Sequence, residues 1–250
     1  MSNTAWGRKR LMTVSDAPSD PVQSSEIRSV VAKVWVAESS ESPYRFAEKV
    51  MSSNWSRLWT IGNRALLDVP MLGLLCSRQC TGDAIVRLYD LARALRDAGV
   101  TIVSGFHSPM EQECLNLLLR GTQPIVVCPA RSLERPRLPK AWQTPIEQGR
   151  LLVLSPFPPE ATRTTQKLTE ARNLFVAELA TALFIAHAAP GSKTETIQQT
   201  LEESGKTVLG FQDSVAATVE FILTTFPLVP DPVKIAAQNA FRDAERGLLR

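Results

Sequence analysis

Histidine, cysteine and long apolar runs are scarce in this chain, and each scarcity excludes a class of protein. Only two histidines, His107 and His187, occur in the 250 residues, and no spacing argument joins either one to a nucleophile and an acidic residue as in a catalytic triad. Among the four cysteines, Cys76 and Cys80 are spaced CxxxC, and no second pair or histidine completes a zinc-ligand set. The sequence therefore predicts no metal site, no disulfide framework and no catalytic residue of the triad type.

The chain also lacks a segment that would cross a membrane or direct secretion. No apolar run approaches the ~20 residues that a membrane-spanning helix needs. Residues 1–25 are rich in serine, proline and aspartate and contain no apolar core of a signal peptide. We therefore expect a flexible tail over 1–25 and a cytoplasmic protein that does not associate with membranes.

The net charge of +3 is too small to demand a polyanionic partner, but the basic residues are unevenly placed. Residues 131–172 hold eight basic residues against four acidic ones, so this segment carries +4 and the rest of the chain −1. Such a stretch can recruit phosphate groups, although a solvated basic surface is the simpler interpretation of it.

Short apolar segments alternate with amphipathic ones from residue 70 onward. The apolar segments lie at 71–76, 100–104, 124–128, 151–155, 182–187 and 207–211. The expected helices between them include 82–98, one that begins at 109, 166–181 and 193–204. Because these strands are apolar throughout, they are typical of a parallel sheet that is covered on both faces. The sequence predicts an α/β fold: a Rossmann-like, doubly wound, mostly parallel sheet with helices on both faces.

Four regions follow from this pattern. After the tail 1–25, residues 26–69 have a helical tendency and several aromatic side chains to bury, which predicts a small helical N-terminal lobe. Residues 70–211 form the Rossmann-like domain. Residues 212–250 are expected to form two C-terminal helices, 212–225 and 232–249, separated by prolines.

Polar and basic residues follow three of the expected strands, and an Arg-Asn pair lies on the helix that precedes one of them. Ligands bind beyond the carboxyl ends of the strands in open α/β sheets, so these signals should converge. Arginine can form paired hydrogen bonds to a phosphate, and glycine permits a tight turn or the close approach of a ligand. The sequence thus predicts a phosphate site made of Ser77, Arg78, Ser104, Gly105, Arg172, Asn173, Gly191, Ser192, Lys193 and Thr194.

The segment 190–195 (PGSKTE) needs a separate argument, because it has the composition of a phosphate-binding loop. It is not a Walker A loop, since the first glycine is missing and Ser192 separates Gly191 from Lys193. Ordinary helix capping accounts for Ser192 and for Glu195 three residues later. Capping does not account for Gly191 and Lys193. Because a helix start attracts anions, an anion-binding site at this segment remains a second interpretation.

Several segments, in their order and spacing over about 70–211, resemble the DNA-processing protein A family (DprA/Smf). The matching stretches are LLCSRQCTGD, DLARALRDAGVTIVSGF, GRLLVLSPFP and ARNLFVAELATALFIAHAAPGSKTE. The resemblance implies that Arg78 and Arg172, with Asn173 beside them and Lys167 just upstream, line a pocket for single-stranded DNA. This chain has Leu174 and Thr169 where the family has a second arginine and an aromatic residue.

The same resemblance implies a non-enzymatic DNA-processing protein without a cofactor that acts in recombination or DNA uptake. It also implies a homodimer and a RecA-type recombinase as partner. Two alternatives remain open: a nucleotide-binding sensor, and a phosphoribohydrolase of nucleoside monophosphates like the cytokinin-activating (LOG) enzymes of the same superfamily. The hydrolase would need a carboxylate that faces the ribose. Only Glu111 and Glu195 are placed for that role, and both also serve as helix-capping residues.

Overall fold

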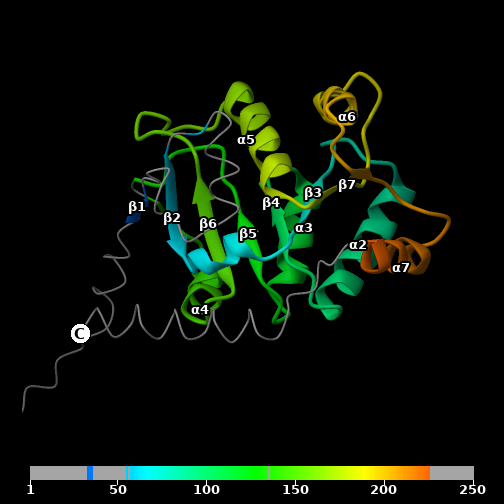
Figure 1. Ribbon diagram of the computed structural model, residues 1–250, viewed down its shortest axis with the longest axis horizontal. Coiled ribbons are helices and arrows are strands. Elements are labelled where there is room, and N and C mark those ends of the chain that lie inside the picture. Colours follow the sequence, from blue (N-terminus) through cyan, green and yellow to red (C-terminus); the bar gives the residue numbers. More distant parts are fainter. Residues whose placement is uncertain (1–32, 36–54, 56, 135, 226–250) are drawn as a thin grey trace, which may run out of the picture. The chain divides into compact units, whose positions relative to one another are not determined.

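The computed structural model describes residues 33–35, 55, 57–134 and 136–225, which carry one large sheet flanked by helices (Figure 1). The strands are β1 (Lys33–Trp35), β2 (Leu58–Gly62), β3 (Leu72–Leu75), β4 (Ile102–Ser104), β5 (Ile125–Val127), β6 (Leu151–Ser155), β7 (Ala182–Ile185) and β8 (Val208–Leu209). The α-helices are α2 (Gly82–Asp97), α3 (Pro109–Leu118), α4 (Gln143–Glu147), α5 (Gln166–Leu179), α6 (Lys193–Glu203) and α7 (Val215–Thr225). Two short 3-10 helices are η2 (Arg64–Asp68) and η3 (Lys140–Trp142).

The order of the strands in the sheet fixes where a ligand would bind. The strands lie in the order β1-β2-β6-β5-β4-β3-β7-β8, parallel from β6 to β8, with β1 and β2 antiparallel at one edge. The chain winds from β3 through β4 and β5 to β6, and then crosses to β7 and β8 on the other side of β3. The winding reverses between β3 and β7, and the crevice beyond such a point is the usual ligand site of a doubly wound sheet.

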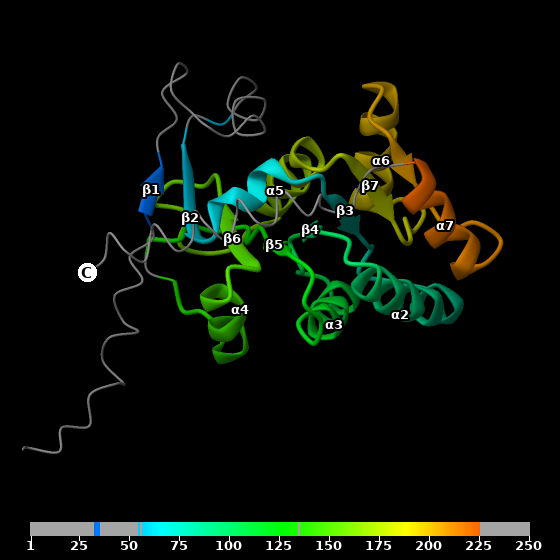
Figure 2. The ribbon, with the colours of Figure 1, turned by 60° about the horizontal axis from the view of Figure 1, so that its bottom comes forward.

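Alternate residues of the strands pack into two apolar cores, one on each face of the sheet. On one face Leu74 of β3 clusters with Leu91 of α2 and Cys114 of α3. The next residue of the same strand, Leu75, clusters on the opposite face with Phe175 of α5. Figure 2 shows the two layers, with α2, α3 and α4 on one side of the sheet and α5 and α6 on the other. The expected α/β fold, a mostly parallel sheet with helices on both faces, is confirmed.

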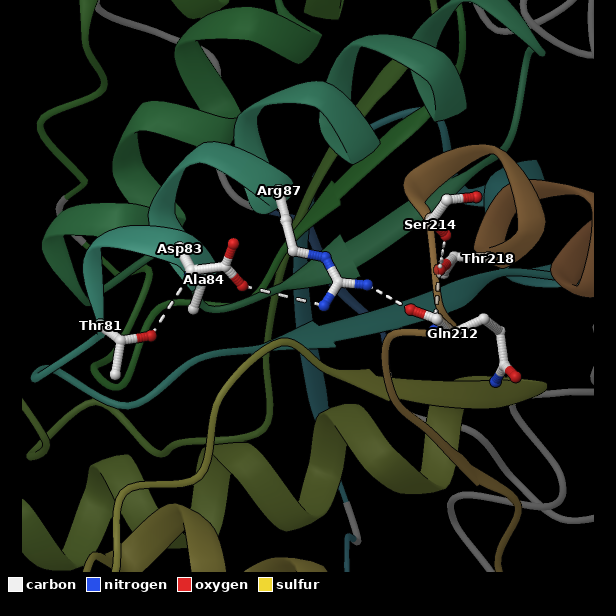
Figure 3. Close-up of polar contacts among 7 residues, drawn as sticks. All are labelled: Thr81, Asp83, Ala84, Arg87, Gln212, Ser214 and Thr218. Carbon is white, nitrogen blue, oxygen red and sulfur yellow. Dashed lines mark hydrogen bonds and ion pairs between the residues drawn. The ribbon is translucent and has the colours of Figure 1, made fainter.

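Helix α7 packs against α2, and Arg87 of α2 binds the loop that leads into α7 (Figure 3). The guanidinium of Arg87 donates to the backbone oxygen of Gln212 and forms an ion pair of 3.8 Å with Asp83. It also lies 4.4 Å from the ring centre of Phe211. Helix α7 is the first of the two expected C-terminal helices; the second, 232–249, lies outside the described residues, as does the tail 1–25.

The expected helical lobe over 26–69 is wrong for the residues that the structure describes there. Residues 33–35 and 58–62 are strands, and β2 pairs antiparallel with β6 from Trp59↔Ser155 to Gly62↔Leu152. The pairing supplies backbone hydrogen bonds and buries Leu58, Trp59 and Ile61, and these long-range contacts override the local helical tendency. The one helical element described in this region is the 3-10 helix η2.

None of the helices in the described part of the chain is long and apolar enough to cross a membrane.

Candidate phosphate and nucleic-acid site

A pocket of about 450 Å³ lies beyond the carboxyl ends of β3 and β4. Three helices begin at its wall: α3, whose N-cap is Ser108; α5, whose N-cap is Thr165; and α6, whose first residues are Lys193 and Thr194. Each helix start carries a partial positive charge from its backbone dipoles. Three of them around one pocket favour an anionic ligand.

The floor of this pocket contains an arginine that is almost completely buried. Arg172 of α5 is 2% exposed; its Nε donates to Asn173 Oδ1 (2.8 Å) and its Nη1 to the backbone oxygen of Cys128 (3.2 Å). No carboxylate of the described residues forms an ion pair with it, and its Nη2 has no acceptor among them. Burial lowers the pKa of Arg172, and the charge of nearby Glu111 acts in the opposite direction. A buried cation without a counter-ion is costly, so an anion in the pocket would offset that cost.

Gly105 makes room for this arginine. A Cβ atom at position 105 would lie 0.9 Å from Arg172 Nη1 and 1.8 Å from its Cζ, so no larger residue fits while the guanidinium stays in place. The next residue, Phe106, has a positive φ of 45°, a conformation that residues other than glycine rarely adopt. Ser104 Oγ accepts the N–H of Phe106 (3.2 Å) and helps to hold this turn. Of the two roles expected for Gly105, a tight turn or the close approach of a ligand, the second is corrected, because the Arg172 side chain fills the space beside the glycine.

Glu111 connects the ends of β3 and β4 beneath the pocket. One oxygen of its buried carboxylate accepts the N–H of Cys76 (3.0 Å), and the other accepts those of His107 (2.8 Å) and Ser108 (3.1 Å). Ser108 Oγ in turn accepts the N–H of Glu111 (3.3 Å), so the predicted capping box is confirmed. Because the carboxylate already accepts three backbone N–H groups, a general-base role would require several of these bonds to break.

The loop after β3 carries the exposed Arg78 directly after the buried Ser77, which anchors the loop. Ser77 Oγ accepts the N–H of Ala189 (3.1 Å) and lies 3.2 Å from Ser192 Oγ, so it ties this loop to the loop between β7 and α6. The N–H of Ser77 donates to the backbone oxygen of His187 (2.9 Å). Arg78 follows, exposed and on the wall of the pocket. The anchored loop thus presents an exposed cationic side chain to the pocket.

Lys193 is the second cation on the wall, and it already has an acidic neighbour. Its Nζ lies 3.3 Å from Glu170 Oε1 of α5, across the pocket. Hydrogen bonds from Gln166 and Lys193 lower the pKa of Glu170. With the lysine side chain 63% exposed, this ion pair is screened by water and weak, so a phosphate can compete for the lysine.

The start of α6 is a helix cap, as expected. Ser192 Oγ accepts the N–H of Glu195 (3.1 Å), and the Glu195 carboxylate accepts the N–H of Gly191 (2.7 Å). Gly191 has a positive φ of 72°, which explains the glycine. Because its N–H is already bonded to Glu195, that group is not free for a phosphate.

The predicted site residues fall into three groups. Five line the pocket: Arg78, Arg172, Asn173, Lys193 and Thr194. Four support it without being among its lining residues: Ser77, Ser104, Gly105 and Ser192. Two are not part of the lining: Lys167, which is exposed on α5, and Gly191.

The predicted site residues did not include nine further residues of the lining: Cys76, His107, Ser108, Glu111, Thr164, Thr165, Gln166, Thr169 and Glu170. Thr165 caps α5 by accepting the N–H of Leu168 (3.2 Å). Threonine is a preferred N-cap residue, and Thr165 directly precedes an expected helix. This position could have indicated from the sequence that the start of α5 forms part of the wall. Within residues 33–35, 55, 57–134 and 136–225, no group of three or more His, Cys, Asp or Glu side chains is placed to hold a metal ion.

Comparison with known proteins finds solved structures of the same fold. Two similar solved structures are DNA processing protein A from Streptococcus pneumoniae and from Helicobacter pylori, each 18% identical to this chain. The first has a TM-score of 0.57 over 77% of this chain and 69% of that one; the second has 0.56 over 78% and 90%. The Helicobacter pylori structure is described with a single-stranded DNA binding mode of that protein. These likenesses establish the shared fold.

Among curated proteins, none matches this chain. The sequence profile of the DNA recombination-mediator protein A family matches residues 33–220, which is most of the chain and includes every residue of the pocket. The chain belongs to the DNA recombination-mediator protein A family, a family of DNA-processing proteins.

Proposed function

We propose that this protein binds single-stranded DNA by holding backbone phosphates in the pocket at the carboxyl edge of its sheet. The observation that carries the proposal is the convergence of Arg78, Lys193 and the buried Arg172 with three helix starts on one pocket. Among the described residues, Arg172 has no carboxylate partner. Phosphate is the anion that these groups suit, since arginine offers paired donors and the helix starts offer backbone N–H groups.

The lining favours contacts to the backbone of the nucleic acid over contacts to its bases. Besides the carboxylates of Glu111 and Glu170, its polar groups are mainly cations, hydroxyls and two amides, which suit phosphate and sugar oxygens. Thr169 occupies the wall and offers a hydroxyl that already donates to the backbone oxygen of Thr165 (2.9 Å). Among the residues that the structure describes, the imidazole of His107 is the one aromatic ring of the lining that could stack on a base. Binding should therefore depend little on base sequence.

In the cell, this activity would serve recombination or DNA uptake in the cytoplasm. Membership in a recombination-mediator family supports this role, with a RecA-type recombinase as partner and a homodimer as the working form. The relative from Helicobacter pylori, whose binding of single-stranded DNA is named, supports the same ligand class.

Titration of a labelled single-stranded oligonucleotide over a salt series tests the proposal. Affinity should fall as salt rises, with a log–log slope of ~−0.7 for each neutralised phosphate. Arg78→Ala should weaken binding and make the slope shallower by about 0.7, whatever the base sequence. Arg172→Lys should also weaken binding, because lysine cannot replace the planar donor set of arginine.

Arg120→Ala is the matched control, because it removes the same charge from an exposed residue just after α3, away from the pocket lining. It should leave both affinity and slope near the wild-type values. Binding that does not respond to salt, or wild-type binding by Arg78→Ala, would contradict the proposal. A nucleoside monophosphate that displaces the oligonucleotide at low concentration would instead favour the nucleotide-sensor alternative.

A further inference from the structure

Two free thiols touch at the wall of the pocket. The Sγ atoms of Cys76 and Cys80 lie 2.8 Å apart, and both cysteines are free. A disulfide bond is about 2.05 Å long, so closing it here would need a movement of less than ~1 Å. Cys76 lines the pocket, and Arg78 lies between the two cysteines in the sequence.

The backbone on both sides keeps the thiols together. Cys76 directly follows β3, and its N–H is bonded to the carboxylate of Glu111 (3.0 Å). Cys80 directly precedes Thr81, whose hydroxyl caps α2 by accepting the N–H of Ala84 (3.3 Å; Figure 3). The thiol of Cys80 also donates to the backbone oxygen of Ser77 (3.2 Å). A strand end and a helix start therefore hold the pair in contact.

The two thiols differ in access, and this sets the order of reaction. Cys76 is 5% exposed, and burial, with Cys80 beside it, strongly raises its pKa. Cys80 is half-buried, so an oxidant in solution reaches Cys80 first. The other two cysteines, Cys114 and Cys128, are fully buried, and burial raises the pKa of each to about 12.

We propose that Cys76 and Cys80 form a reversible disulfide that weakens phosphate binding at Arg78; the binding part of this inference rests on the proposed function. A hydroperoxide oxidises the Cys80 thiol to a sulfenic acid and is itself reduced, releasing water or an alcohol. The Cys76 sulfur then attacks the Cys80 sulfur, the S–S bond forms and water leaves. The two thiols together lose two electrons and two protons to the hydroperoxide, and a small thiol reverses the reaction by exchange.

The disulfide would act on the loop that carries Arg78. It encloses residues 77–79 in a small ring, and the backbone oxygen of Ser77 loses the thiol that donates to it. Ser77 is also the anchor for the loop before α6, through Ala189 and Ser192. Oxidation therefore restricts Arg78 and disturbs the wall that carries Lys193.

Peptide mapping tests the modification without reference to DNA. Trypsin cuts after Arg64, Arg78 and Arg87, which places the two cysteines in separate peptides, 65–78 and 79–87. Protein treated with hydrogen peroxide should give these two peptides joined by a disulfide, and dithiothreitol should separate them. If they do not join, or if the oxidised cysteines pair elsewhere, the inference is wrong.

Binding of the same oligonucleotide tests the consequence. Oxidised wild-type protein should bind about tenfold more weakly than reduced protein, as expected for the loss of one charged hydrogen bond. Cys80→Ser should bind the oligonucleotide like the reduced wild type, and its affinity should not change on treatment with the oxidant. Cys114→Ala should lose affinity on oxidation as the wild type does. A joined peptide with unchanged affinity would overturn the effect on binding. If reduced protein does not bind at all, the proposed function fails and the effect on binding with it, while the peptide map still decides whether the disulfide forms.

Discussion

The floor and the wall of the pocket are built from different kinds of contact. The floor consists of Gly105, Glu111 and Arg172, which are buried or packed against one another and bonded to backbone groups of several loops. The wall cations, Arg78 and Lys193, are exposed, and the one ion pair of Lys193 is open to water. Both sets present charge to the same cavity.

This difference separates two kinds of mutational effect. A change in the floor removes a buried hydrogen bond or fills occupied space, so it must lower stability together with binding. A change in the wall removes a solvated side chain, so it can lower binding alone. Experiments that measure unfolding and binding on the same variants can therefore assign each residue to floor or wall.

The largest expected effect is that of Gly105→Ala. The added methyl group would occupy the place of the Arg172 guanidinium, with its Cβ 0.9 Å from Nη1. We expect the free energy of unfolding to fall by ~1–3 kcal/mol and DNA binding to weaken as well. Urea unfolding followed by tryptophan fluorescence measures the first effect. Gly82→Ala is the control, since a Cβ there meets nothing within 4 Å. Equal stability of the two variants would show that Arg172 is not held in this position.

Glu111→Gln should have an effect on stability of similar size. The amide has only one oxygen to accept the three backbone N–H groups that the carboxylate accepts, and its NH2 group would face a donor. We expect a loss of ~1–3 kcal/mol of unfolding free energy, compared with no measurable change for the exposed Glu203→Gln.

The same variant addresses the hydrolase alternative. We expect the wild type to release no free base from AMP or CMP, because the Glu111 carboxylate is occupied by backbone donors. Base release that disappears in Glu111→Gln but persists in Glu203→Gln would favour the hydrolase.

The fold was largely predictable because its strands are local apolar runs. The six strands expected from residue 70 onward are all present, and α2 occupies Gly82–Asp97 where 82–98 was predicted. The strand β2 was not predicted, because it becomes a strand only by pairing with the edge of β6, far away in the sequence. The five-residue α4 is too short to show a periodic pattern.

The pocket was predictable where a residue follows a strand, and not where its role depends on a distant partner. Arg78 and Lys193 were found from their positions after β3 and β7. Gly105 was assigned to a tight turn or to the close approach of a ligand, because no sequence pattern indicates that the Arg172 side chain fills the space beside it. The capping role of Glu111 was predicted from Ser108, but its bond to Cys76 joins two strand ends and follows only from the fold.

The smallest expected effects distinguish a helix cap from a binding residue at the start of α6. Ser192→Ala removes the acceptor for the Glu195 N–H and the contact with Ser77 Oγ, so the free energy of unfolding should fall by ~1 kcal/mol. Its effect on affinity should be slight, because Ser192 is not among the residues that line the pocket.

Lys193→Ala should show the opposite pattern. Because the ion pair of Lys193 with Glu170 is exposed, the melting temperature of the variant should equal that of the wild type. Its affinity for DNA should fall, and the log–log slope against salt should become shallower by about 0.7. Melting temperature and affinity, measured together on Ser192→Ala and Lys193→Ala, separate the two roles. If Lys193→Ala binds DNA like the wild type, this segment is only a cap. The phosphate would then be held by Arg78, Arg172 and the starts of α3 and α5, because no other lysine belongs to the lining of the pocket among the described residues.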